Sequence, residues 1–133
     1  MALHHDPHWI RAGSWFVEKS EGRADFAIVG VGAHEKAITP NNADQTPRAI
    51  RDALLRYSTW NQTCQIDSAD YLTAGDFGNV SNPDNTEAVI PLIADAIHRS
   101  DFLVALGGDN SITYSGVMAL ASVVGGLDKV GLI

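Results

Sequence analysis

The sequence predicts an α/β fold with a largely parallel sheet, and the order of its apolar segments is the main reason. Short, continuous apolar runs, typical of strands buried on both faces, alternate with longer segments whose apolar residues recur at helical spacing. Strand–helix–strand units of this kind favour right-handed crossovers, which place the strands parallel in one sheet. The composition fits one globular domain, because 45% of the 133 residues are hydrophobic and 19% are charged.

The first strand is predicted over Asp25–Gly32, an apolar run closed by spaced glycines. Gly30 and Gly32 form a G-x-G, but the third glycine of the dinucleotide spacing is missing, so the pattern is too weak to indicate a nucleotide site. His34 and Glu35 follow in the next loop. We take them as candidates for the substrate side of a crevice at the strand end, with an ordinary solvated loop pair as the alternative.

Residues 1–24 are predicted as an N-terminal tail with a short helical segment, and residues 25–133 as the α/β domain. Pro7 lies among the histidines of the tail and disfavours a helix that would bring them together, so we expect them in solvent: His4, His5 and His8. The segment that follows carries aromatic residues expected to cover a sheet edge: Trp9, Trp15 and Phe16.

A long polar loop over Lys36–Thr46 precedes the first large helix. Thr46 is predicted to cap this helix, and Pro47 to take its first position. Apolar residues recur on one face as far as Tyr57. The arginines occupy the other face, where we expect solvent: Arg48, Arg51 and Arg56.

The remaining segments continue the alternation. A polar linker over Trp60–Ala69 holds Cys64 and leads into a second strand within Tyr71–Val80. A helix is predicted from Asn85 or Thr86 to His98–Arg99, with Pro91 able to bend or delay it. The last predicted elements are a strand over Asp101–Leu106, a helix from Ile112 to Val124 stopped by Gly125-Gly126, and the start of a fourth strand at Lys129–Ile133.

Polar residues follow the third strand abruptly, in the run Gly107-Gly108-Asp109-Asn110-Ser111. A phosphate loop would need more glycines and a lysine, and Asp109 would repel the anion. A nucleophile elbow would need G-x-S-x-G around Ser111. Oxygen donors at a strand end fit a hard metal ion or a polar substrate better, and a helix cap that only braces the turn is an equal alternative.

The segment Gly107–Thr113 resembles the G-G-D-H-S-[IL]-T motif of the ureohydrolases, a family that includes arginase, agmatinase and formiminoglutamase. Thr46–Arg51 is similar to the family's G-P-x-x-I-R helix start, and Asp76–Val80 to its D-x-G-D-V segment, with Asn79 in place of an acid. Ile28–Val31 is similar to its opening strand. The resemblance spans about Asp25 to Ile133, and only the Gly-Gly-Asp segment is distinctive.

The resemblance implies a three-layer α-β-α, mostly parallel, arginase-like fold, of which this chain would be the N-terminal part. It also implies hydrolysis of a guanidinium or amidine carbon by a hydroxide that bridges two manganese ions. The family's histidine ligand corresponds to Asn110, whose carbonyl oxygen is a weaker ligand for manganese. Asp109 and Ser111 would then orient Asn110 or cap the helix.

The family's other ligands come from a D-A-H-x-D segment and a later S-x-D-x-D-x-x-D-P segment. Neither is present before Ile133, so we assign no catalytic residue and expect this chain to be inactive. In the family, later strands separate the third strand from the fourth. We therefore expect an open edge on the third strand, and either a marginal fold or pairing with another chain.

The charge of the chain limits its partners. A net charge of −7 and an isoelectric point near 4.9 disfavour binding to nucleic acid or to an anionic membrane surface. No apolar window is long enough to span a bilayer, and one cysteine fits the reducing cytoplasm. We expect a small amidine or guanidine substrate and, for the complete protein, a homo-oligomer.

Two functions follow from the sequence. The first is a portion of a manganese-dependent ureohydrolase that acts on agmatine, arginine or formiminoglutamate, with Lys36–Gln45 shaping substrate choice. The second is a non-catalytic α/β module that binds a partner or a small polar ligand.

Overall fold

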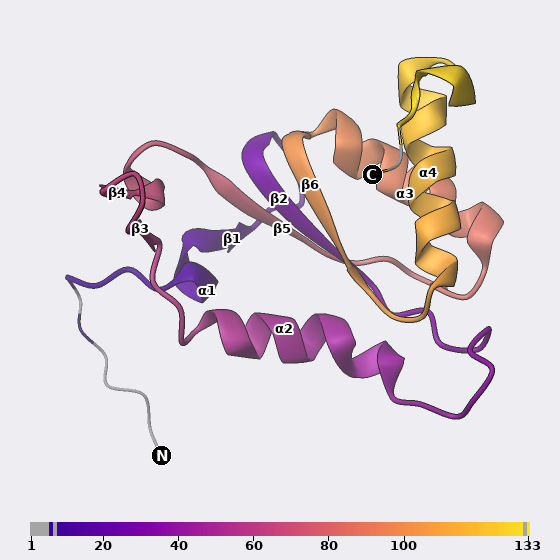
Figure 1. Cartoon of the computed structure of the whole chain (residues 1–133), viewed down its shortest axis with the longest axis horizontal. Helices are drawn as coiled ribbons and strands as arrows, with labels where there is room; N and C mark the ends of the chain where they lie inside the picture. Colours follow the sequence, from indigo (N-terminus) through magenta and orange to yellow (C-terminus); the bar gives the residue numbers. More distant parts are fainter. Residues whose placement is uncertain (1–5, 7, 132) are drawn as a thin grey trace.

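The computed structural model describes residue 6, residues 8–131 and residue 133, and a four-stranded parallel sheet lies at its centre (Figure 1). The order across the sheet is β1-β5-β2-β6, so the two longest strands are neighbours. The parallel sheet with flanking helices confirms the predicted fold class. The strands are β1 (Phe16–Glu18), β2 (Ala24–Val31), β5 (Ala74–Asn79) and β6 (Ser100–Gly107).

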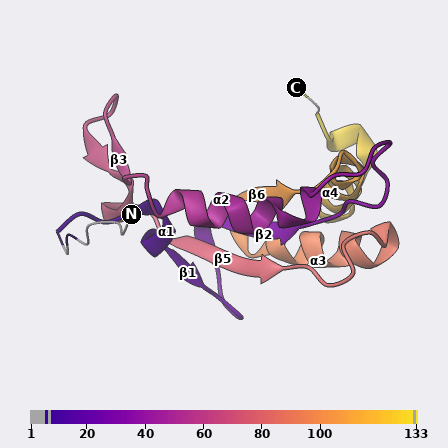
Figure 2. The same ribbon diagram turned by 90° about the horizontal axis from the view of Figure 1, so that it is seen from below.

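The helices lie on both faces of this sheet, as expected from the crossovers. Successive residues of a strand point to opposite faces, and β2 shows this directly. Gly30 faces Pro47 of α2 (Thr46–Leu54), whereas Val31 packs with residues of α3 (Thr86–His98) and α4 (Ser111–Val124). Figure 2 shows α2 crossing in front of the strands, with α3 and α4 behind one end of them.

The core lies between the sheet and the α3–α4 pair. Val31, Val89, Ile93 and Ala119 are fully or almost fully buried there, with partly buried apolar side chains around them. β2 is central in the sheet and buried along most of its length, which explains why its sequence reads as a continuous apolar run. The core thus fixes β2 and β6, whose ends carry the candidate site.

The ends of α3 and α4 agree with their capping signals. Asn85 caps α3 by accepting a hydrogen bond from the N–H of Ala88 at 3.2 Å. The helix begins before Pro91 and continues through it, so the proline does not delay it. α4 ends at Gly125, which has a φ of +82°, and the N–H groups of Gly125 and Gly126 both donate to Ala121 O.

The start of α2 differs from the prediction. Thr46 is the first helical residue and not the cap, and Pro47 takes the second position. A 3-10 turn, η1 (Ala43–Gln45), runs directly into the helix, and the N–H of Thr46 donates to Ala43 O. The turn satisfies this donor, and the residue before the helix, Gln45, makes no side-chain cap bond.

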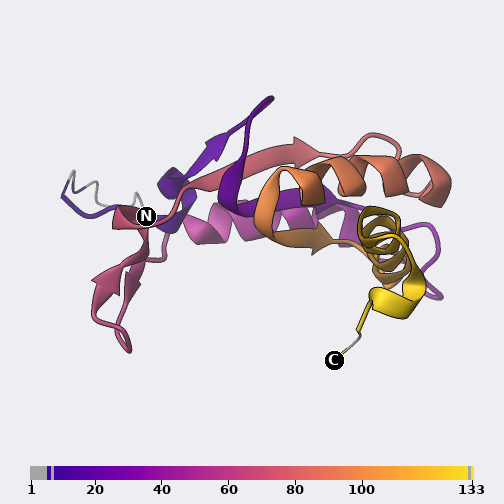
Figure 3. The same ribbon diagram turned by 90° about the horizontal axis from the view of Figure 1, so that it is seen from above.

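Three short strands were not predicted. Within the N-terminal segment the helical part is only α1 (Ala12–Trp15), and Phe16–Glu18 forms the edge strand β1. The supposed linker contains an antiparallel hairpin of β3 (Trp60–Asn61) and β4 (Ile66–Asp67), which Figure 3 shows projecting from the end opposite α4. A 3-10 turn, η2 (Ser68–Asp70), follows it. The histidines His4 and His5 of the tail lie outside the described residues.

The predicted fourth strand is not formed by the described residues of the segment Lys129–Ile133. Lys129 ends a 3-10 turn, η3 (Leu127–Lys129), and Val130 has an extended backbone without a strand partner. Leu132 lies outside the described residues. β6 is therefore an edge of the sheet, as expected. Among the described residues, no helix has the length and hydropathy to cross a bilayer.

Candidate functional site

The carboxyl ends of β2 and β6 meet at one edge of the sheet, and their loops are joined there. Gly108 lies so close to Ala33 that a Cβ added to it would come within 2.0 Å of Ala33 O. The N–H of Asp109 donates to the same oxygen at 2.7 Å. Only glycine allows this approach, so the glycines of the turn serve contact between two loops. The loop that carries His34 and Glu35 is thus joined to the turn that carries Asp109, Asn110 and Ser111.

Asp109 stabilises the first turn of α4. Its Oδ1 accepts hydrogen bonds from the N–H of Ser111 at 2.9 Å and from the Ser111 hydroxyl at 2.5 Å. Its Oδ2 accepts one from the N–H of Lys36 at 3.1 Å. Asn110 is exposed and makes no capping bond with its side chain. The amide of Asn110 therefore faces outward from a turn that Asp109 holds.

The hydrogen bond from the Ser111 hydroxyl is the main cause that lowers the pKa of Asp109. Partial burial acts in the opposite direction, and the N–H groups of Ser111 and Lys36, together with the Lys36 charge, outweigh it. Asp109 is consequently ionised at neutral pH, with both oxygens already engaged inside the protein.

His34 and Glu35 lie in the loop after β2, with exposed side chains. The structure adds a residue that the sequence did not single out. Asp84, in the turn before α3, accepts hydrogen bonds at Oδ1 from the N–H groups of His34 and Glu35, at 2.7 and 2.9 Å. Its Oδ2 lies 3.4 Å from His34 Nδ1. No local pattern could have revealed this contact, because about 50 residues separate the partners.

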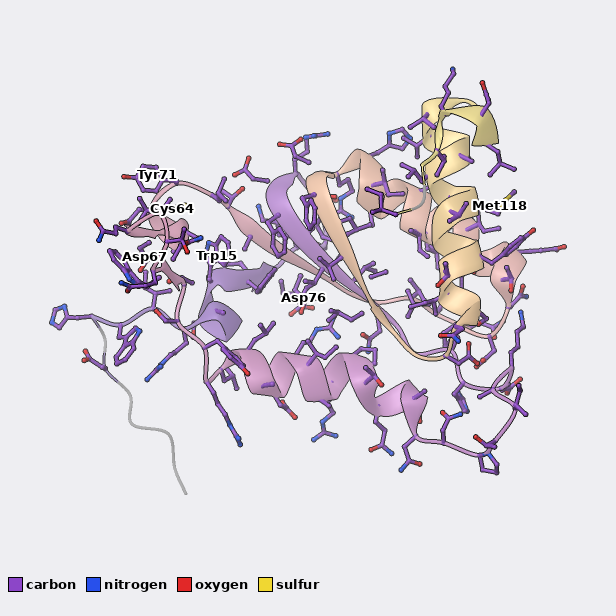
Figure 4. The ribbon with its side chains drawn as sticks, in the orientation of Figure 1. Trp15, Cys64, Asp67, Tyr71, Asp76 and Met118 are labelled. Carbon is purple, nitrogen blue, oxygen red and sulfur yellow. The ribbon has the colours of Figure 1, made fainter. Side chains whose placement is uncertain are left out.

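Arg51 corrects the prediction that the α2 arginines face solvent. Its side chain is only 23% exposed, and it donates to both oxygens of Asp76 on β5, from Nε at 2.5 Å and from a terminal nitrogen at 2.7 Å. It also donates to Asn79 Oδ1 at 2.8 Å and to Gly78 O at 3.0 Å. Figure 4 shows Asp76 between its strand and α2. The two supporting motifs are thus joined in one network.

Two opposing effects set the pKa of Asp76. Burial raises it and is the largest single effect, but the hydrogen bonds from Arg51 and Gly78 and the Arg51 charge together lower it below the usual value. The pair forms part of the wall of a cleft of about 420 Å³, which Phe16, Glu18, Arg48 and Asp52 also line. The pair also bonds Gly78 and Asn79, so it braces α2 against the end of β5.

The donor groups at the strand ends do not fit a complete manganese site. Among the residues that the structure describes, no group of three or more His, Cys, Asp or Glu side chains could hold a metal ion. Both oxygens of Asp109 accept hydrogen bonds within the protein, whereas the exposed side chain of Asn110 makes no capping bond. Cys64, on the β3–β4 hairpin, lies far from this edge (Figure 4).

Comparison with solved structures shows the arginase-like fold. Formimidoylglutamase from Bacillus subtilis superposes with a TM-score of 0.78 at 20% identity, over 92% of this chain and 40% of that one. Trypanosoma cruzi formiminoglutamase, solved with Mn²⁺, gives 0.70 at 23% identity, over 86% and 41%. Agmatine ureohydrolase of Thermoplasma volcanium gives 0.61 at 22% identity, over 73% and 34%.

The chain thus spans about 40% of the length of the first of these structures. A comparison with curated proteins gives no significant match. A comparison with protein families matches residues 24–133 to the Arginase family. This match includes β2, β5, β6 and the turn at Asn110, and it covers most of the chain. The chain therefore belongs to the arginase family.

Proposed function

We propose that this chain is a portion of a manganese-dependent ureohydrolase that hydrolyses a C–N bond of a linear amidine or guanidine. The observation that carries the proposal is the exposed amide of Asn110, held by Asp109 at the carboxyl end of β6 in an arginase-family sheet. Ligands of open α/β sheets bind at this end of the strands. The substrate class is that of arginine, agmatine and formiminoglutamate.

Each residue has one role in this proposal. Asn110 offers a neutral carbonyl oxygen as one metal ligand. Asp109 remains ionised and orients the turn through Ser111, and it does not itself reach the metal. His34 and Glu35 lie on the substrate side of the same edge. We assign no catalytic residue to this chain, and we expect it to be inactive by itself, because one ligand position does not hold two manganese ions.

Three further expectations belong to the same proposal. We place the protein in the cytoplasm, expect the complete protein to be a homo-oligomer, and expect the loop Lys36–Gln45 to contribute to substrate choice. The solved relatives differ in their substrates: two are named for formimino- or formimidoylglutamate and one for agmatine. The candidate substrates therefore have to be tested side by side.

A second candidate function is a non-catalytic α/β module that binds a partner or a small polar ligand. The observation that favours it is the lack, among the described residues, of three acidic, histidine or cysteine side chains placed to hold a metal. Under this alternative, Asp109 and Ser111 only cap α4. The two functions differ in whether the protein hydrolyses a substrate when Mn²⁺ is present. A hydrolysis assay therefore distinguishes them.

The test is an assay of urea release from arginine and agmatine, and of formamide release from formiminoglutamate, with Mn²⁺ present. Two polypeptides are compared: the 133-residue chain, and one extended by the codons that follow Ile133 in the gene. We expect no product from the 133-residue chain, and hydrolysis of one substrate by an extended polypeptide that contains Asp-Ala-His-x-Asp. Failure of such an extended, manganese-loaded polypeptide on all three substrates would favour the non-catalytic module.

A further inference from the structure

We infer that Asp84 is a positioning residue that holds the loop of His34 and Glu35 after β2 in place. The contacts of Asp84 stand by themselves, whereas its effect on catalysis rests on the proposed function. Asp84 lies in the turn between β5 and α3, in neither the Gly-Gly-Asp turn nor the loop that it binds. Its side chain is 15% exposed, so the carboxylate is largely withdrawn from water.

The contacts of Asp84 are directed at consecutive backbone donors. The N–H groups of His34 and Glu35 converge on Oδ1, at 2.7 and 2.9 Å. Successive N–H groups of this kind form a concave anion site, and here an internal carboxylate fills it. A carboxylate bonded to two N–H groups is a stronger acceptor than a neutral oxygen. The backbone at His34 and Glu35 is thereby fixed, while both side chains stay exposed.

A second carboxylate continues this pattern at the next residue. The N–H of Lys36 donates to Asp109 Oδ2 at 3.1 Å, and Lys36 Nζ donates to Thr86 Oγ1 at the start of α3. Three consecutive N–H groups of one loop are therefore held by carboxylates from the two neighbouring loops. Asp109 also holds the turn of Asn110. Asp84 and Asp109 together therefore fix the loop of His34 and Glu35 relative to this turn.

Asp84 and Asp109 connect the loop to different parts of the fold. Asp109 joins the loop to α4 and the Asn110 turn, whereas Asp84 joins it to the turn before α3. Loss of Asp84 would release His34 and Glu35 while leaving the Lys36–Asp109 bond in place. His34 and Glu35 would then be displaced, while the turn at Asn110 would stay intact.

Amide hydrogen exchange of the 133-residue chain, without metal or substrate, tests this inference. In Asp84→Ala we expect the amides of His34 and Glu35 to exchange at least about tenfold faster, because each loses its acceptor. The amide of Val31 in β2 should be unchanged. Asp84→Asn keeps an acceptor oxygen and should restore most of the protection. Asp95→Asn, at an exposed acid of α3 that accepts a hydrogen bond from Arg99, is the matched control and should change neither loop amide.

Three results would overturn the inference. The first is unchanged exchange at His34 and Glu35 in Asp84→Ala. The second is an equal rise throughout β2, which would show a general structural role, and the third is the lack of any rescue by Asp84→Asn. In an active extended polypeptide, Asp84→Ala should raise KM more than it lowers kcat. Because the exchange experiment needs no activity, its failure is distinguishable from failure of the proposed function.

Discussion

The guanidinium of Arg51 on α2 donates two hydrogen bonds to the carboxylate of Asp76 on β5, at 2.5 and 2.7 Å. The same guanidinium reaches Asn79 and Gly78, so one side chain joins α2 to the end of a central strand. A Cβ added to Gly30 of β2 would come within 1.9 Å of Asn79 Oδ1, so a side chain there would displace Asn79. These contacts link the segment Thr46–Arg51 to the segment Asp76–Val80.

Replacing Arg51 with alanine should lower the free energy of unfolding by about 2 to 3 kcal/mol, because it leaves the partly buried Asp76 carboxylate without its partner. Arg48→Ala is the matched control on the same helix. Arg48 is 88% exposed and lies 3.8 Å from Asp52, so its loss should cost less than about 0.5 kcal/mol. Urea unfolding followed by circular dichroism measures both, and equal effects would contradict the role of Arg51.

The stability contributed by Asp76 should depend on pH in the acid range. The folded pKa is lowered, so the unfolded state binds protons more readily than the folded state. The contribution is complete above the ordinary pKa, 3.8, and is lost as the pH falls from there through the lowered folded pKa. Asp109 and Asp25, whose pKa values are also lowered, act in the same direction.

Urea unfolding at a series of pH values from about 6 to 2.5 measures this dependence. The wild-type chain should lose stability below about pH 4, and Asp76→Asn should show a shallower loss because one of the linked groups is gone. Parallel curves for the two proteins would show that Asp76 titrates normally in the folded chain.

Replacing Gly108 with alanine should destabilise the chain by about 3 kcal/mol or more, because the new Cβ would come within 2.0 Å of Ala33 O, a backbone atom. The control is Gly116→Ala in α4, where a Cβ meets no atom within 4 Å. Alanine is the better helix former there, so this variant should gain about 0.5 to 1 kcal/mol. Thermal unfolding of both variants checks the opposite signs; a Gly108→Ala variant as stable as the unaltered chain would refute the close approach.

The open edge of β6 should make the isolated chain self-associate. Phe102–Leu106 carries no charge and no proline, the usual protection of an edge strand, and Phe102 is 60% exposed. We expect sedimentation velocity to show association that grows with concentration, and Phe102→Lys to reduce it. Val17→Lys, at a residue 58% exposed on the short strand β1 of the other edge, should have little effect.

A wild-type chain that stays monomeric at all concentrations and unfolds cooperatively in urea with ordinary stability would contradict the expected behaviour of this edge. Stability at the usual level would be about 5 to 15 kcal/mol.

The fold was largely predictable because its main signals are local. Continuous apolar runs mark β2 and β6, and Asn85 and Gly125 mark helix ends through their own backbone preferences. Strand β1 was missed because three residues give no periodicity, and its conformation depends on pairing with β5. The fourth strand, in contrast, has a strand-like sequence but no strand partner among the described residues.

The candidate site was predictable only in part. The Gly-Gly-Asp-Asn-Ser turn is local, so the sequence located it, and the close approach of Gly108 to Ala33 explains its glycines. The roles of Arg51 and Asp84 depend on partners about 25 and 50 residues away. Helical spacing placed Arg51 on the polar face of α2, but it could not show that Asp76 lies opposite that face.

In this chain of the arginase family, Asn110 is proposed to supply one corner of a manganese site. A titration of the metal-free 133-residue chain with Mn²⁺, followed by electron paramagnetic resonance, tests it most directly. We predict weak binding without saturation at a fixed stoichiometry, tightened in Asn110→His and unchanged in Asn61→His on the hairpin. Tight, stoichiometric binding by the unaltered chain, or equal binding by both variants, would contradict this role of Asn110.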